Sequence, residues 1–127
     1  MNREKFARIL VVDDEPQVAR MIGRYLTQKG YNVMFASTGE EAIRETKIRR
    51  PHLVLLDMLM PGRGGLTALK EIKQADPAVR VIMITGVQED DLAQAAMHAG
   101  AADYLTKPLD LEYLGLTVEA QLTLAMS

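Results

Sequence analysis

The sequence lacks cysteine and contains only two histidines among its 127 residues. Without cysteine the chain forms no disulfide and no thiolate metal site, and the wide separation of His52 from His98 argues against a zinc centre. Its uninterrupted apolar runs are no longer than a strand, far below the ~20 residues that cross a bilayer. Any chemistry must therefore use carboxylates, hydroxyls, lysines or the backbone.

The chain also lacks a strong charge of either sign. Fifteen Lys and Arg residues against seventeen Asp and Glu leave a formal net charge of −2. Such a balance gives no general basic field, so we expect no direct binding of nucleic acid and no membrane association. Residues 1–6 do not form the apolar segment of a secretory signal, and we predict a cytoplasmic protein.

Five short aliphatic runs predict five β-strands. They cover residues 9–12, 33–36, 53–56, 79–84 and 102–105. Most of these runs do not alternate apolar with polar residues, which is typical of parallel strands that are covered on both faces. Each gap between them has room for one helix, the rhythm of repeated βα units.

The segments that follow the strands have helical periodicity. The first helix starts near Pro16 and stops before Gly30, and the second opens at Thr38, which forms a capping box with Glu41. The other three helices are predicted over residues 65–74, 88–99 and 111–125. No linker or repeat interrupts this order. The pattern predicts one α/β domain, a five-stranded parallel sheet with helices on both faces in a doubly wound (βα)5 arrangement.

Four of the five predicted strands end in a charged or hydroxyl side chain. These are Asp13 and Asp14 after the first strand, Asp57 after the third, Thr85 after the fourth and Lys107 after the fifth. Taken alone, each of these residues has a structural explanation. The paired aspartates could cap the first helix, Asp57 could be a turn residue, and Lys107 could be a solvated surface cation. Parallel sheets bind ligands beyond the carboxyl ends of their strands. The convergence of these five side chains at that edge therefore favours one functional site.

The chemistry of these groups indicates phosphoryl transfer. Three carboxylates within ~5 Å repel one another by ~3 kcal/mol per pair at an effective dielectric near 20, and Lys107 supplies a single compensating charge. Oxygen ligands without thiolate or imidazole suit a hard divalent cation such as Mg²⁺. An aspartate nucleophile beside a metal, a lysine and a hydroxyl is the constellation that phosphoryl transfer requires.

These motifs resemble the receiver domain of bacterial two-component response regulators, of the chemotaxis-regulator type. The resemblance extends from Ala7 to Leu124 and implies a flavodoxin-like fold. The matching motifs are Asp13-Asp14 after Ile-Leu-Val-Val, Leu-Leu-Asp57-Met-Leu-Met-Pro61-Gly62 with Gly65-Leu66, Thr85, and Ala102-Asp103-Tyr104-Leu105-Thr106-Lys107-Pro108.

The resemblance assigns a role to each site residue. It implies that Asp57 accepts a phosphoryl group from the phosphohistidine of a histidine kinase or a histidine phosphotransfer protein. It also implies that Mg²⁺ or Mn²⁺ is bound by Asp13, Asp14, Asp57 and the backbone carbonyl of Leu59. Lys107 would pair with the phosphoryl group.

A conformational switch is implied by the same resemblance. Thr85 would move toward the phosphoryl group, and Tyr104 would turn into the space that Thr85 leaves; an ordinary half-buried aromatic is the alternative for Tyr104. The Lys107–Pro108 bond is expected to be cis. The readout surface would be the fourth helix, the fifth strand and the fifth helix.

The last predicted helix has two apolar stripes. One consists of Leu111, Leu114, Val118 and Leu122, and the other of Tyr113, Leu116, Ala120 and Leu124. The first suits packing on the sheet, whereas the second favours contact with a second copy or an output domain over wide burial within the domain. Gly115 would allow another segment to approach closely.

The interpretation that follows is a phosphoacceptor signalling domain that is not a turnover enzyme. Residues 1–127 would form one receiver domain, alone or as the N-terminal part of a longer regulator. Two alternatives stay open: a receiver-like binding module that is not phosphorylated, and a metal-dependent phosphatase with an aspartyl nucleophile. The phosphatase class usually has Asp-x-Asp on its first strand, whereas Asp13 and Asp14 are adjacent.

Overall fold

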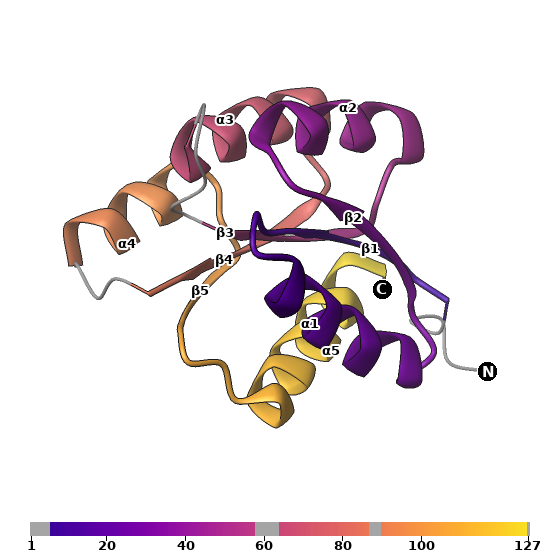
Figure 1. Cartoon of the computed structure of the whole chain (residues 1–127). Helices are drawn as coiled ribbons and strands as arrows, with labels where there is room; N and C mark the ends of the chain where they lie inside the picture. Colours follow the sequence, from indigo (N-terminus) through magenta and orange to yellow (C-terminus); the bar gives the residue numbers. More distant parts are fainter. Residues whose placement is uncertain (1–5, 58–63, 87–89, 127) are drawn as a thin grey trace.

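A five-stranded parallel sheet forms the centre of the molecule (Figure 1). The computed structural model describes residues 6–57, 64–86 and 90–126. The strand order is β2-β1-β3-β4-β5, and every neighbouring pair is parallel. The strands are β1 (Arg8–Val12), β2 (Asn32–Ala36), β3 (Leu53–Asp57), β4 (Arg80–Thr85) and β5 (Asp103–Thr106). This is the order of flavodoxin-like sheets, as predicted.

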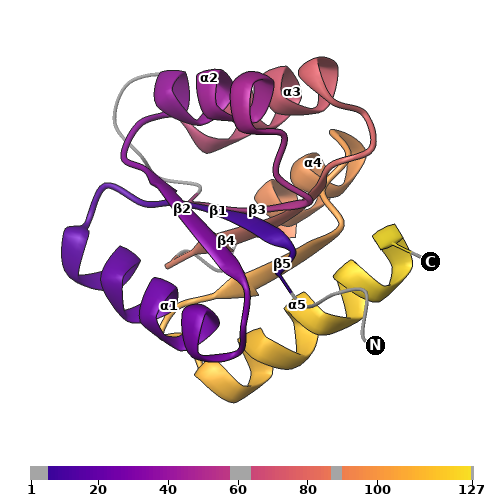
Figure 2. The same ribbon diagram turned by 90° about the vertical axis from the view of Figure 1, so that its right-hand side faces the viewer.

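Helices cover both faces of the sheet (Figure 2). Helices α1 and α5 lie against one face, and α2, α3 and α4 lie against the other (Figures 1 and 2). Their bounds are α1 (Pro16–Gln28), α2 (Gly39–Arg49), α3 (Gly65–Ala75), α4 (Asp90–His98) and α5 (Leu111–Met126). Within the described ranges no helix is both long and apolar enough to cross a membrane.

Each face of the sheet has its own hydrophobic core. Leu10 and Val12 of β1 belong to the cluster that packs beneath α2, α3 and α4. Ile9 and Val11 point to the opposite face and belong to the cluster beneath α1 and α5. Because both sets of side chains are buried, the strand sequence is apolar without interruption, which is the pattern that predicted it.

The start of α2 confirms half of the predicted capping box. The Glu41 backbone N–H donates a 3.1 Å hydrogen bond to Thr38 Oγ1, which satisfies one orphan donor of the helix. In the reverse direction, the Glu41 carboxylate accepts from the backbone N–H of Ser37 at 3.3 Å. The predicted partner of that carboxylate was Thr38, so the contact lies one residue earlier.

The two stripes of α5 have different environments. Leu114, Val118 and Leu122 are fully buried against the sheet. Tyr113, Leu116 and Leu124 are 57%, 65% and 60% exposed. The second stripe is therefore an outward apolar surface, and wide burial within the described part of the chain does not account for it.

Candidate functional site

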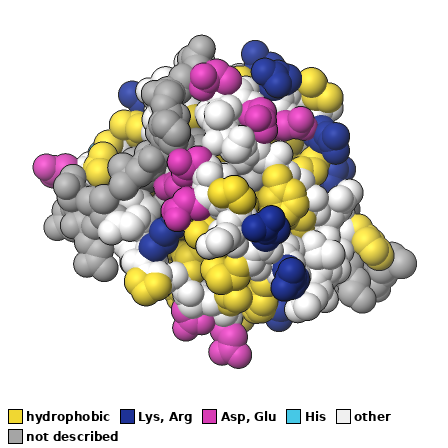
Figure 3. Space-filling model, in the orientation of Figure 1, with side chains coloured by type: hydrophobic (Ala, Val, Ile, Leu, Met, Phe, Trp, Pro, Cys, Tyr) yellow, Lys and Arg dark blue, Asp and Glu magenta, His cyan; other side chains and the backbone are white. Residues whose placement is uncertain are grey.

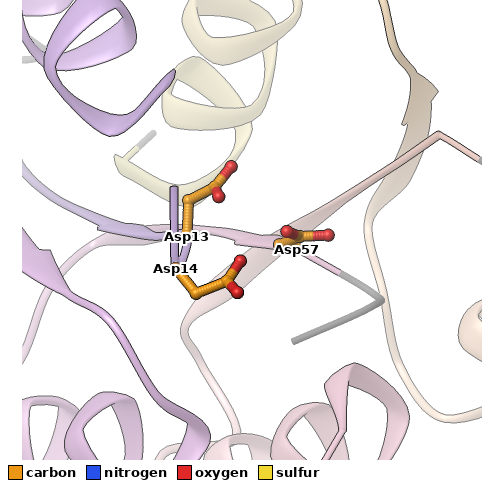
Figure 4. Close-up of side chains that lie close together, drawn as sticks. All are labelled: Asp13, Asp14 and Asp57. Atoms are coloured by element: carbon orange, nitrogen blue, oxygen red, sulfur yellow. The ribbon is translucent and has the colours of Figure 1, made fainter. Parts of the chain in front are cut away.

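Three carboxylates converge where β1 and β3 end. These strands are neighbours in register, with Val12 opposite Leu56, so the residues that follow meet at one edge of the sheet. Asp13, Asp14 and Asp57 each offer an oxygen atom, and these three atoms lie within 4.8 Å of one another (Figure 4). The cluster occupies the switch point between β1 and β3, where flavodoxin-like sheets bind their ligands.

The donor set fits a hard divalent cation. Asp13 and Asp57 are only 5% exposed, whereas Asp14 is exposed and leaves the cluster open to solvent on one side. In the space-filling view, acidic side chains gather at the centre-left of the visible face with a basic side chain beside them (Figure 3). Three negative oxygens at this spacing are unfavourable without a counter-charge, and an oxygen-only set suits Mg²⁺ or Mn²⁺.

Asp13 is held by the backbone on both sides. Its N–H donates to the Ala36 carbonyl at 3.1 Å, which extends the pairing of β1 with β2. Its Oδ1 accepts the Glu15 N–H at 2.9 Å. The N-cap of α1 is Glu15, whose side chain makes no capping hydrogen bond. Asp13 therefore contacts the N-cap residue of α1, while its second carboxylate oxygen faces Lys107, so capping alone does not account for its contacts.

Lys107 extends its ammonium group into the carboxylate cluster. Its Nζ lies 3.4 Å from Asp13 Oδ2, 3.7 Å from Asp57 Oδ2 and 3.3 Å from Glu15 Oε1. Its backbone N–H donates to the Thr85 carbonyl at 2.6 Å, and the Lys107–Pro108 bond is cis, as predicted. The side chain of Lys107 is thus anchored at the end of β5 and directed across to β1 and β3.

Opposing effects act on the pKa of Lys107. Partial burial alone lowers this pKa, but the charges of Asp57 and Asp13 and hydrogen bonds to Glu15 and Asp13 raise it. The net result is a pKa above the ordinary lysine value of 10.5, so the side chain is a permanent cation at neutral pH. One cation among these carboxylates leaves the site with excess negative charge.

The two proposed switch residues lie on adjacent strands. Thr85 ends β4, is fully buried and pairs with Thr106 of β5. Tyr104 lies two positions earlier on β5, opposite Met83, where it is half-buried and packs against the α2–α3–α4 core. The remaining predicted ligand, the Leu59 carbonyl, lies outside the described residues and stays a prediction.

Glu15 is the site residue that sequence reasoning missed. It directly follows Asp13 and Asp14 in the chain, which was the available signal, but its pairing with Lys107 joins segments 92 residues apart. Such a contact depends on which direction the β1–α1 connection takes, and sequence spacing does not specify that direction.

A family model described as the response regulator receiver domain matches residues 9–119. The chain belongs to this family. Receiver domains are the phosphorylated modules of two-component systems and typically bind Mg²⁺, and the acidic cluster of this receiver domain could hold that ion.

Solved structures of other receivers have the same fold. A CheY-like receiver domain from Methanospirillum hungatei superposes with a TM-score of 0.92 at 26% identity, covering 95% of this chain and 97% of that one. A LuxR-family response regulator from Aurantimonas has a TM-score of 0.88 at 36% identity, covering 94% and 86%.

Curated relatives of this receiver domain differ greatly in length. The chemotaxis protein CheY of Bacillus subtilis is 39% identical over 83% of this chain and 88% of its own length. The regulatory protein AtoC of Escherichia coli is 38% identical over 92% of this chain but only 25% of its own length. Against the first curated relatives that it matches, the chain spans a quarter to a half of their length.

Proposed function

We propose that this receiver domain is a phosphoacceptor whose Asp57 takes a phosphoryl group from the phosphohistidine of a histidine kinase or histidine phosphotransfer protein. The observation that carries the proposal is the carboxylate cluster at the switch point, with Lys107 Nζ 3.7 Å from Asp57. Asp57 is also the carboxylate that stands at the acceptor position of the receiver motif Leu-Leu-Asp57-Met.

The transfer exchanges one bond to phosphorus for another. An oxygen of Asp57 attacks the phosphorus, and the bond from phosphorus to the histidine nitrogen breaks. The nitrogen keeps that electron pair and, once the ring carries one proton, leaves as neutral imidazole. Lys107 stabilises the phosphoryl oxygens, and the Thr85 hydroxyl donates a hydrogen bond to one of them. Mg²⁺ or Mn²⁺, held by Asp13, Asp14 and Asp57, supplies further positive charge when bound.

Phosphorylation would then select between two conformations of the domain. Thr85 reports on the phosphoryl group, and Tyr104 on the next strand adjusts to its position. The chain would act once per phosphoryl group received, as a signalling component of the cytoplasm and not as a turnover enzyme. The cytoplasmic location and the extent of the domain over residues 1–127 stay predictions.

The decisive experiment is phosphorylation by acetyl phosphate, read out as intact mass. With Mg²⁺ present, the wild type is expected to gain one labile phosphoryl group and release acetate. Asp57→Asn is expected to gain none while keeping its circular dichroism spectrum. Asp91→Asn, which removes an exposed carboxylate from α4, is the matched control and should be phosphorylated normally.

Other results would favour the alternatives. An adduct that persists in Asp57→Asn would contradict the assignment of the acceptor. Hydrolysis of unrelated phosphoesters would favour the phosphatase. Absence of an adduct with acetyl phosphate and with phosphorylated kinase would favour the binding module.

The α4–β5–α5 face is the proposed partner surface, and we assign it to a second copy of this chain. Its exposed stripe of Tyr113, Leu116 and Leu124 is apolar, so two copies can pack without opposite charges. An output domain is the alternative occupant. Beryllofluoride should shift the wild type to a dimer in size-exclusion chromatography, and Leu116→Glu should stay monomeric.

The control for that experiment is Ile48→Glu. Ile48 is 69% exposed on α2, so this variant introduces the same charge at an equally exposed apolar position of another helix. It should dimerise like the wild type. A beryllofluoride-bound wild type that stays monomeric would contradict the second copy and leave the output domain as the occupant.

A further inference from the structure

Lys107 makes its shortest side-chain contact with a residue outside the acidic triad. Its Nζ is 3.3 Å from Glu15 Oε1 and 3.4 Å from Asp13 Oδ2, and both contacts are hydrogen bonds. The 3.7 Å approach to Asp57 Oδ2 is an ion pair only. The ammonium group therefore lies between the β1–α1 connection and the proposed acceptor, with its two hydrogen bonds on the Asp13–Glu15 side and the charge of Asp57 on the other.

The backbone N–H groups of Glu15 and Lys107 are both hydrogen-bonded, so the backbone positions of these two residues are fixed. The Glu15 N–H is bonded to Asp13 Oδ1, and the Lys107 N–H is bonded to the Thr85 carbonyl. Only the side chains are left to move. The Glu15 side chain is 62% exposed and that of Lys107 is 23% exposed, so Glu15 can turn into solvent with little loss of packing.

We propose, resting on the function proposed above, that Glu15 is a positioning residue that restrains Lys107 in the unphosphorylated domain. An ammonium group has three hydrogens to donate, and three carboxylates, those of Asp13, Glu15 and Asp57, contact it at 3.3 to 3.7 Å. A phosphoryl group on Asp57 brings up to two negative charges and three strong acceptor oxygens. Lys107 then leaves Glu15 for the phosphoryl group, and breaking the Glu15 contact is part of the barrier to phosphorylation.

The test compares Glu15→Gln, Glu15→Asp and the wild type in their reaction with acetyl phosphate. Glu15→Gln removes the charge with the shape kept, so the maximal rate constant at saturating acetyl phosphate should rise roughly two- to fivefold, the range for an exposed ion pair. Glu15→Asp keeps the charge but shortens the side chain by one methylene, which weakens the contact. It should therefore give an intermediate rate.

A general electrostatic effect would produce a different pattern. If Glu15 only repels the anionic donor, Glu15→Gln changes the half-saturating concentration and not the maximal rate, and Glu15→Asp behaves like the wild type. Either result overturns the proposal. Glu45→Gln, which removes the carboxylate of an ion pair with Arg49 on α2, is the control and should leave both parameters unchanged.

A second measurement needs neither metal nor phosphoryl donor. The ¹³Cε–¹Hε NMR signal of Lys107, assigned by its loss in Lys107→Arg, should shift in Glu15→Gln and stay in place in Glu45→Gln. An unmoved signal in Glu15→Gln overturns the proposal. If the wild type forms no phosphoryl adduct at all, both the phosphoacceptor function and the role of Glu15 are contradicted. If the wild type and Glu15→Gln are both phosphorylated at the same maximal rate, only the role of Glu15 is contradicted.

Discussion

Gly115 of α5 lies directly against the ring of Tyr25 of α1. A Cβ atom at Gly115 would be 2.8 Å from Tyr25 Oη, closer than real Cβ atoms approach their neighbours, and 3.1 Å from Cε2, which is a tight contact. Tyr25 packs on the α1–α5 side of the core, and the Lys29 ammonium group lies 5.3 Å from the centre of its ring. The absence of a side chain at Gly115 is therefore what allows the end of the Tyr25 side chain to lie against α5.

Gly115→Ala is expected to destabilise the fold by about 1 kcal/mol. Alanine gains up to about 1 kcal/mol of helix propensity, but displacing the tyrosine ring costs more, typically about 1–3 kcal/mol for overpacking. In a Tyr25→Ala background the same substitution should instead stabilise the protein. Chemical denaturation of the four proteins of this double-mutant cycle measures the coupling. Equal effects in both backgrounds would show that the contact carries no energy.

Thr38→Ala should cost about 1 kcal/mol of unfolding free energy. The substitution removes the Oγ1 that accepts the Glu41 N–H at the start of α2. Thr38→Ser keeps the acceptor and should stay within about 0.5 kcal/mol of the wild type. Urea denaturation compares the three proteins, and similar losses in both variants would place the effect in the threonine methyl group.

Asp14→Asn is expected to have opposite effects with and without metal. In metal-free buffer it relieves repulsion among three converging carboxylates and should stabilise the fold by about 1 kcal/mol. In Mg²⁺ the wild type gains stability by binding the ion, about 2.7 kcal/mol at one hundred times the dissociation constant, and the variant should gain much less. Thermal melts in EDTA and in MgCl₂ measure both effects.

The control for the metal experiment is Asp91→Asn, which removes an exposed carboxylate outside the cluster. Its Mg²⁺-dependent gain should equal that of the wild type. If Asp14→Asn gained as much as the wild type, Asp14 would not be a ligand.

The environment of His52 leads us to expect that the folded state loses stability in mild acid. Its Nδ1 accepts the backbone N–H of Arg8 at 3.0 Å, so the ring must be neutral there. Burial, followed by the charge of Arg8, lowers the pKa of His52 below 6.5. The unfolded chain then takes up this proton at higher pH than the folded one. The contribution of neutral His52 to the free energy of unfolding is complete above about pH 6.5 and is lost as the pH falls through the folded-state pKa.

His52→Asn tests this dependence because the amide oxygen can replace Nδ1 as acceptor but does not titrate in this range. The difference in unfolding free energy between wild type and variant should change between pH 7.5 and pH 5. His98→Asn, at the exposed second histidine, is the control and should follow the wild type. A constant difference for His52→Asn across this range would contradict the assignment.

The sequence predicted the fold well because its signals are local or periodic. Most strands contain an uninterrupted apolar run, and Thr38 and Pro16 mark helix starts by their own chemistry. The edge of the sheet that collects Asp13 and Asp57 follows from parallel strand order alone. The close approach at Gly115 was also predicted, although its partner Tyr25 was not.

Contacts that depend on side-chain direction were not predictable. Glu15 reaches Lys107 through the particular course of the β1–α1 connection, and the Glu41 carboxylate accepts from the backbone N–H of Ser37 and not from that of Thr38. Residue type states what a side chain can bond to, but only the packed backbone determines which acceptor comes within reach. The outward exposure of Leu116 agrees with the second apolar stripe, which favoured partner contact over burial, but the pattern alone does not name the partner.

The sheet divides the interior into two hydrophobic layers, and this division affects how the sequence of each layer can vary. Ile9 and Val11 pack only toward α1 and α5, whereas Leu10 and Val12 pack toward the other three helices. Substitutions in one layer can be accommodated without rearranging the other, since the backbone ladder between them is shared but the side chains are not. The two outer surfaces can therefore diverge independently among regulators while the edge that bears Asp13 and Asp57 keeps its geometry.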